Sequence, residues 1–255
     1  SECVADCGDG IVALGEECDD GVNDGGYSEC GADCKIAEHC GDGIVQEGYE
    51  DCVDGNYFEI AYSLQRQFGP DGIYRDLTLY SFCDNHDVDR VASRLRDPSQ
   101  LYPLYCLLFT MPVVAAIYYG SEWGIAGRRT ATSDRALRPA LRLETMRVEA
   151  PHPDLPAAIA RLAALRAATP ALQDGRYIQL GVQALWLAFL RDGPGQRVVV
   201  VVNGGGTAVT VELAIPEPAV RAAHDLLDAG EPVAVHRNVL RVEVPANWAR
   251  VLALS

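Results

Sequence analysis

The sequence predicts an α/β fold followed by an all-β domain, with a disulfide-rich, loop-dominated segment in front of both. Seven of the nine cysteines and sixteen of the 36 acidic residues lie in the first 55 residues. Between residues 56 and 175, apolar runs of helical length alternate with short runs rich in Val, Ile and Tyr, which is typical of a parallel sheet. From residue 176 onward, only short β-rich runs remain. We therefore expect three domains, 1–55, 56–175 and 176–255.

The charge of the chain is concentrated in the first of these domains. Residues 1–55 carry sixteen Asp and Glu against a single Lys, whereas the remaining twenty acidic residues are balanced by twenty Arg. Because Lys and Arg drive binding to phosphates, the acidic segment and the neutral remainder both argue against nucleic acid as a partner.

Cysteine density predicts how residues 1–55 are held together. A segment with few large apolar side chains cannot build a sufficient core, so crosslinks must stabilise it. This favours an oxidising environment and therefore a secreted or cell-surface protein. The pairing stays open, since seven is an odd number. The disulfide candidates are Cys3, Cys7, Cys18, Cys30, Cys34, Cys40 and Cys52.

The same segment contains an internal repeat. CGDGIVALGEEC, which starts at Cys7, returns as CGDGIVQEGYEDC, which starts at Cys40. The pattern resembles the cysteine-rich repeats of secreted and surface proteins of myxobacteria. The Asp-rich loop at residues 19–24 could bind calcium, but it lacks EF-hand spacing, so solvated turns are favoured. Cys34, His39 and Cys40 could suggest a zinc site, but the disulfide repeat explains these cysteines better. We expect no cofactor or metal.

Residues 56–83 begin the α/β region with a helix and a strand. Apolar residues near helical spacing, with Asn56 as N-cap and Gly69-Pro70 as a stop, predict a helix over 56–68. The apolar run at 77–83 predicts a strand.

A second helix and strand follow in residues 101–119. The uncharged stretch 101–120 is long enough to suggest a membrane span, but Pro103 and Pro112 divide it. We expect a buried helix over 101–111 and a strand over 113–119, and no membrane span. A further helix is predicted over 155–168, ended by Pro170.

The last domain is predicted to be a small antiparallel β-sandwich, because its short strands recur at turn-like spacing. The runs are residues 177–180, 184–190, 198–203, 208–213, 233–236, 239–244 and 250–254.

An amide, an imidazole and a carboxylate stand side by side directly after the strand at 77–83. The run LYSFCDNHDVDR that contains Asn85, His86 and Asp87 resembles the fourth sequence signature of the α-amylase family, glycoside hydrolase family 13. In that family the signature ends the seventh strand of a (β/α)8 barrel. The run IYYGSEWGIAGRR, residues 117–129, resembles the eighth strand and its loop. The likeness extends over residues 56–255 and is nearest to oligosaccharide-cleaving members such as neopullulanases.

The resemblance implies roles for individual residues. Asp87 would stabilise the transition state, and His86 would bind a sugar hydroxyl with support from Asn85. Arg90 and Trp123 complete the implied substrate-binding set, although Trp123 also fits a packing aromatic. The expected ligand is an α-glucan or maltooligosaccharide.

Taken in isolation, the sequence Asn-His-Asp is explained better by a hydrogen-bonded turn after a strand than by a sugar-binding or catalytic site. The matching strand, helix and second strand around it reverse that preference. Cys83 and Cys106 are expected to be buried thiols, and Glu122 a supporting acid.

The catalytic pair of the family has no counterpart in the sequence. A retaining glycosidase needs a carboxylate nucleophile and a carboxylic acid, which the family places on its fourth and fifth strands. We find neither those strands nor a Gly-x-Arg-x-Asp motif, so the chain is expected to hold only the last two barrel strands and to have little or no activity alone.

Four alternatives stay open. The chain could be a carbohydrate-binding or adhesive surface module, or a non-functional rearranged fusion. Another chain could supply the missing barrel strands, or copies of the chain could associate through exposed barrel strands.

Overall fold

The computed structural model describes Val22 and residues 30–35, 56–228 and 230–255, and it divides the chain into two compact units, Ser1–Cys52 and Val53–Ser255. In the first unit, Cys30 and Cys34 are buried and disulfide-bonded. The other five disulfide candidates, the repeat and most of the Asp-rich loop lie outside the described residues. The disulfide-rich repeat and the domain limits at residues 55 and 175 therefore stay predictions.

The second unit begins with helix α1, Tyr57–Phe68, which confirms the predicted helix. The Asn56 side chain caps it by accepting a hydrogen bond from the backbone N–H of Phe58 at 3.1 Å. Its buried residues, Tyr57, Ala61, Leu64 and Phe68, are spaced by three or four positions and so share one face. This face packs against strands β3 and β4 of the large sheet described below.

Strands β1, Leu79–Phe82, and β2, Val113–Ala116, pair in parallel, as the sequence predicts, but both are shorter than expected. Helix α2, Leu101–Thr110, connects them and is buried almost all round because it is apolar on every side. Among the described residues, no helix is long and apolar enough to cross a membrane.

Three further helices follow β2. Helix α4, Leu155–Ala168, buries Leu155, Ile159 and Leu162 and packs against α2. Pro170 separates it from helix α5, Pro170–Asp174, because proline fits the first helical position better than the interior. Helix α3, Leu143–Glu149, and α5 have no counterpart in the sequence prediction. Short 3-10 turns occupy Val91–Ser93, Pro98–Gln100, Ser121–Trp123 and Arg135–Leu137.

The remaining strands form one eight-stranded antiparallel sheet in the order β3-β4-β5-β10-β7-β8-β9-β6. Its edge strands β3 and β6 contact each other, so the sheet nearly closes. The antiparallel prediction is confirmed, and β7 is the strand that the sequence missed. The bounds are Arg176–Gln183 for β3, Trp186–Gly193 for β4, Gln196–Asn203 for β5, Val209–Ala214 for β6, Ala222–Asp225 for β7, Val233–His236 for β8, Val239–Val244 for β9 and Trp248–Leu254 for β10.

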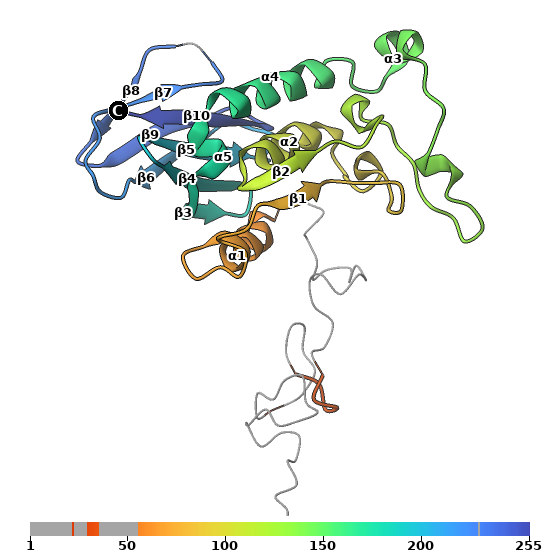
Figure 1. Ribbon diagram of the computed structural model, residues 1–255, viewed down its shortest axis with the longest axis horizontal. Coiled ribbons are helices and arrows are strands. Elements are labelled where there is room, and N and C mark those ends of the chain that lie inside the picture. The colour runs from red at the N-terminus through yellow and green to blue at the C-terminus, as the bar shows by residue number, and fades with distance from the viewer. Residues whose placement is uncertain (1–21, 23–29, 36–55, 229) are drawn as a thin grey trace, which may run out of the picture. The chain divides into compact units, whose positions relative to one another are not determined.

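Alternate residues of β5 serve two hydrophobic cores. Val198, Val200 and Val202 pack into a core shared with α1, α2, α4 and α5, whereas Val199 and Val201 face the interior of the bent sheet. Helices α1, α2 and α5 lie over one face of the sheet, and the β1–β2 pair lies beside α2 (Figure 1).

Two arginines bind the carbonyls at the end of α2, one from the large sheet and one from α4. The fully buried Arg191 of β4 donates to the carbonyls of Thr110, Leu172 and Gly175, the last two at 3.0 and 2.9 Å. Arg166 of α4 donates to carbonyls at the end of α2. Burial lowers the pKa of Arg191 to about 9. These bonds satisfy carbonyls that the ends of α2 and α5 leave without helical partners.

Candidate functional site

The predicted site residues lie at the carboxyl end of β1. In a parallel pair both strands send their following loops to the same edge, so the loop after β1, residues 83–91, meets the loop after β2, residues 117–129. The backbone N–H of Arg90 donates to the Gly127 carbonyl at 2.9 Å, and the backbone N–H of Arg129 donates to Asp89 Oδ1 at 2.7 Å. The parallel pairing thus brings together residues about forty positions apart.

Asn85 builds the turn that presents its two neighbours. Its side-chain oxygen accepts hydrogen bonds from the backbone N–H groups of Asp87 at 2.8 Å and Val88 at 3.2 Å. This is the side-chain-to-backbone turn that asparagine favours, so the predicted supporting role of Asn85 has a direct geometric basis.

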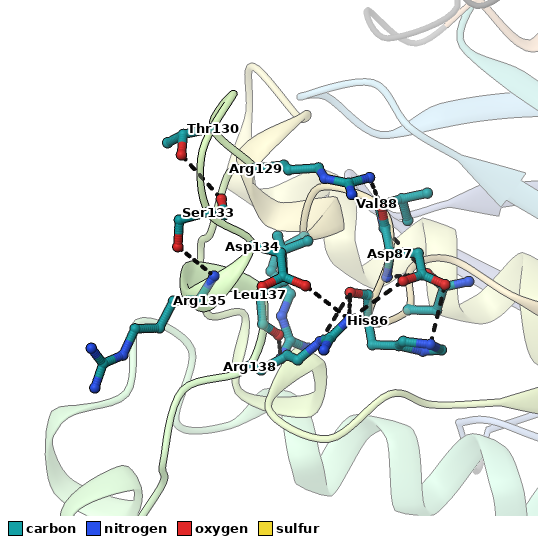
Figure 2. Close-up of polar contacts among 12 residues, drawn as sticks. His86, Asp87, Val88, Arg129, Thr130, Ser133, Asp134, Arg135, Leu137 and Arg138 are labelled. Carbon is teal, nitrogen blue, oxygen red and sulfur yellow. Dashed lines mark hydrogen bonds and ion pairs between the residues drawn. The ribbon is translucent and has the colours of Figure 1, made fainter.

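His86 and Asp87 face solvent next to each other. His86 Nε2 lies 3.1 Å from Asp87 Oδ2, and 57% and 61% of the two side chains are exposed. The His86 ring also approaches the Tyr118 ring, with 6.3 Å between the ring centres. The imidazole and the carboxylate thus form a polar pair that is open to a ligand on the surface (Figure 2).

Arg138 is a member of this site that the sequence prediction missed. Its Nη2 lies 3.4 Å from Asp87 Oδ1 and 2.9 Å from Asp134 Oδ2, and its guanidinium also reaches the His86 carbonyl (Figure 2). In the chain, 51 residues separate Arg138 from Asp87. No local pattern could have indicated the contact, because it depends on how the loop after β2 returns to β1.

Arg90 occupies a different position from the one that its predicted substrate-binding role requires. Its side chain is fully buried and donates to the carbonyls of Tyr119 at 2.8 Å and Leu137 at 2.7 Å. Its guanidinium also lies 4.2 Å from the centre of the Tyr118 ring. Arg90 therefore holds loops together beneath the surface and does not reach it.

Trp123 lies in the 3-10 turn after β2 and is half-buried. Gly120 and Gly124, with φ of 89° and 66°, bound this turn, and a side chain at either position would collide with its neighbours. The Trp123 carbonyl accepts from the backbone N–H of His152 at 3.2 Å. Next to it, Glu122 Oε2 is buried and has no hydrogen-bond partner among the described residues.

The two cysteines of this region are free thiols; Cys106 is fully buried, as expected, whereas Cys83 is only partly buried. Burial, with a smaller effect of Asp84, raises the pKa of the Cys83 thiol to about 12. Within residues 30–35, 56–228 and 230–255, no three His, Cys, Asp or Glu side chains gather in a way that could hold a metal ion.

A well-formed hollow lies away from this pair. A cavity of about 410 Å³ is lined by the end of α1 and the start of β3, including Phe68, Arg75 and Tyr177. None of the predicted site residues lines it, so the Asp87 site is a surface site and not an enclosed one.

One face of the β1–β2 pair is uncovered. Tyr80, Phe82 and Val114 expose 69%, 44% and 50% of their surface, and Tyr80 stands opposite Val114 in the register. The alternate residues Leu79 and Ala115 pack against the core. Because side chains alternate along a strand, one face of the pair is buried and the other is open.

Comparison with known proteins relates this fold to α-amylases and a γ-CGTase. No protein-family model and no curated protein sequence matches the chain. The α-amylase from Anoxybacillus matches with a TM-score of 0.61 and 21% identity, over 78% of this chain and 41% of that protein. The γ-CGTase from alkalophilic Bacillus clarkii matches with a TM-score of 0.62 and 22% identity, over 86% of this chain and 32% of that protein. The chain shares its fold with a part of each of these enzymes.

The likeness to the α-amylase from Geobacillus thermoleovorans is similar, with a TM-score of 0.62 and 19% identity over 76% of this chain and 46% of that protein. The chain thus spans less than half the length of each of these structures. Identities this low establish the fold alone.

Proposed function

We propose that this chain is derived from an α-amylase-family glycoside hydrolase, that it binds α-glucans or maltooligosaccharides at the Asp87 site, and that it does not hydrolyse them on its own. The observation that carries the proposal is the exposed His86–Asp87 pair at the carboxyl end of a parallel strand, held 3.1 Å apart on a fold of the α-amylase type. This edge is where the ligands of such sheets bind.

The chemistry of the pair suits a sugar ring. Neighbouring hydroxyls of a glucosyl unit each donate and accept hydrogen bonds, and a carboxylate beside an imidazole can engage two of them. Structures with this fold include complexes with acarbose, maltose and maltotriose, described for the Geobacillus thermoleovorans α-amylase and for AmyP. We take the same ligand class for this chain.

Hydrolysis requires groups that the described residues of the Asp87 site do not supply. A retaining glycosidase holds two carboxyl groups about 5–5.5 Å apart, one of them as a proton donor, in a place that excludes water. Asp87 and Asp134 share Arg138 as their partner, because Arg138 Nη2 contacts both carboxylates. Both carboxylates are exposed to solvent, so the site fits recognition and not bond cleavage.

Binding of maltotriose to the folded chain tests this proposal. We expect saturable changes in the NMR signals of the loop after β1 and a dissociation constant in the range of about 0.1–1 mM, typical of a few surface hydrogen bonds. Asp87→Asn should weaken binding by about tenfold or more, because it removes the charged acceptor.

Asp134→Asn is the matched control, since it removes the other carboxylate of Arg138 and should change binding by less than about threefold. No saturable binding by the wild-type chain would overturn the proposal and would favour a non-functional rearranged fusion.

Two further proposals concern location and association. The cysteine content of residues 1–55 supports a secreted or cell-surface protein, where a glucan-binding chain could also serve as an adhesive module.

We propose, in addition, that two copies associate through the open face of the β1–β2 pair. Exposed large apolar side chains beside unpaired strand edges support it.

A further inference from the structure

Beneath the exposed His86–Asp87 pair lies a buried polar network made of Asp84, Arg90 and Ser121. All three side chains are at most 2% exposed. The Ser121 hydroxyl accepts from Arg90 Nη1 at 3.0 Å and lies 2.8 Å from both carboxylate oxygens of Asp84, to which it donates. A buried carboxylate and a buried guanidinium are thus linked through one hydroxyl, which offsets the cost of burying each charge.

This network fixes both ends of the loop that carries the site. At one end, Asp84 Oδ2 accepts from the backbone N–H of Val91 at 2.9 Å, which closes the loop on itself. At the other end, the Arg90 backbone bonds to Gly127, and its side chain bonds to the Tyr119 carbonyl. Residues 85–89 are therefore held between two buried anchors.

The same guanidinium also places Arg138. Arg90 Nη2 donates to the carbonyl of Leu137 at 2.7 Å, and Leu137 directly precedes the residue that approaches Asp87. On its other side, Arg90 lies against the Tyr118 ring, which in turn lies beside the His86 ring. One buried arginine thus contacts the segments that present Asp87, His86 and Arg138.

From this geometry we infer that Asp84, Ser121 and Arg90 are positioning residues, which set the relative places of His86, Asp87 and Arg138 for ligand binding. The inference rests on the proposed glucan binding for its functional consequence. The arrangement of the loop in the free protein can be measured without any ligand.

The deciding variant is Ser121→Ala, which removes only the hydroxyl that links Asp84 to Arg90. Thr110→Val is the matched control, because it also removes a fully buried hydroxyl, one that bonds within α2 to the Cys106 carbonyl at 2.7 Å. Both variants should lower the melting temperature by a few degrees, as loss of a buried hydrogen bond does. The melting temperature alone therefore does not separate a positioning role from a structural one.

Two other readouts do separate them: the dissociation constant for maltotriose, and the NMR signal of the His86 ring in the free protein. Ser121→Ala should weaken binding by about tenfold, because a displaced loop after β1 loses about one hydrogen bond to the ligand, and should move the His86 signal. Thr110→Val should leave both as in the wild-type chain.

The inference is overturned if Ser121→Ala binds maltotriose as well as Thr110→Val does and keeps the wild-type His86 signal. If the wild-type chain itself does not bind maltotriose, the proposed function fails, and the His86 signal alone decides the positioning role. Asp84→Asn is the second variant if Ser121→Ala does not fold. It keeps the shape of the side chain, and we expect the same pattern from it.

Discussion

In β5 the five valines from Val198 to Val202 are completely buried, whereas in the β1–β2 pair Tyr80 and Val114 expose 69% and 50% of their surface. Both regions are built from strands rich in apolar residues, so composition does not explain the difference. The eight-stranded sheet is antiparallel, and its edge strands β3 and β6 meet, so it covers its own inner face. The parallel pair has one crossover helix, α2, and that helix covers only one face.

The comparison shows why the candidate site is a surface site. Parallel sheets are normally covered on both faces, because each connection adds a helix to one of them. Among the described residues the parallel pair has only two strands and one open face, and the side chains of His86 and Asp87 in the loop after β1 are more than half exposed. Polar groups placed there can recognise a ligand, but water is not excluded from them.

Removing the arginine that ties the eight-stranded sheet to α2, the helix that connects β1 to β2, should have the largest effect. Arg191→Met leaves the carbonyls of Thr110, Leu172 and Gly175 without their donor, and we expect it to lower the free energy of unfolding by about 3–5 kcal/mol. Arg176→Met, at an exposed position of β3, is the control and should stay within about 0.5 kcal/mol of the wild-type chain. Urea unfolding followed by circular dichroism measures both. Equal midpoints would show that the two regions do not depend on this arginine.

A valine-to-alanine substitution in β5 and another in β2 compare directly how much a buried and an exposed valine contribute to the free energy of unfolding. Val200→Ala opens a cavity in the shared core and should lower the free energy of unfolding by about 2–3 kcal/mol. Val114→Ala removes the same atoms from the open face and should cost less than about 0.5 kcal/mol. If both variants lose the same stability in urea unfolding, the face at Val114 is covered in solution.

Stability at alkaline pH should report the burial of Cys83, which follows β1 and packs against the core. Burial raises the pKa of its thiol from 9.0 to about 12. Below pH 9 both folded and unfolded chains hold the proton. Between pH 9 and 12 only the unfolded chain releases it, so this thiol makes the free energy of unfolding fall as pH rises, by at most about 1.4 kcal/mol per pH unit.

Cys83→Ala should therefore show a smaller loss of stability between pH 9 and 10.5 than the wild-type chain. Urea unfolding at several pH values measures it. Identical pH slopes would mean that the thiol is as accessible in the folded chain as in the unfolded one.

The smallest change in stability is expected on the open face itself. Tyr80→Lys combined with Phe82→Lys should alter the free energy of unfolding by less than about 0.5 kcal/mol, because both side chains are already exposed. If copies associate through this face, the variant should be a monomer by light scattering where the wild-type chain is larger. Val239→Lys, at an exposed position of β9, should keep the wild-type mass. A wild-type chain that is already monomeric would remove the proposed association.

Local patterns were sufficient to predict most of the elements. Spacing and caps located α1, β-branched runs located β5 and β2, and an apolar run located β1, the parallel partner of β2. The sequence missed β7, Ala222–Asp225, because its four residues carry no alternation that distinguishes a strand from a loop.

The site was predictable only in part, for a reason that Arg90 and Arg138 make clear. Both arginines lie near Asn85, His86 and Asp87 in space, but Arg90 is buried and Arg138 is exposed. Arg90 is buried because carbonyls up to 47 residues away receive its hydrogen bonds, and Arg138 reaches Asp87 across 51 residues. Such contacts depend on the tertiary arrangement of two loops, which no local spacing encodes.

The most direct test of the account is an assay of maltotriose and pullulan hydrolysis, run on the same wild-type sample in which maltotriose binding is measured, with Asp87→Asn beside it. We predict saturable binding that Asp87→Asn weakens and no hydrolysis above the background of buffer. Hydrolysis by the wild-type chain that disappears in Asp87→Asn would contradict the account, because it would show that the catalytic carboxylates are present after all.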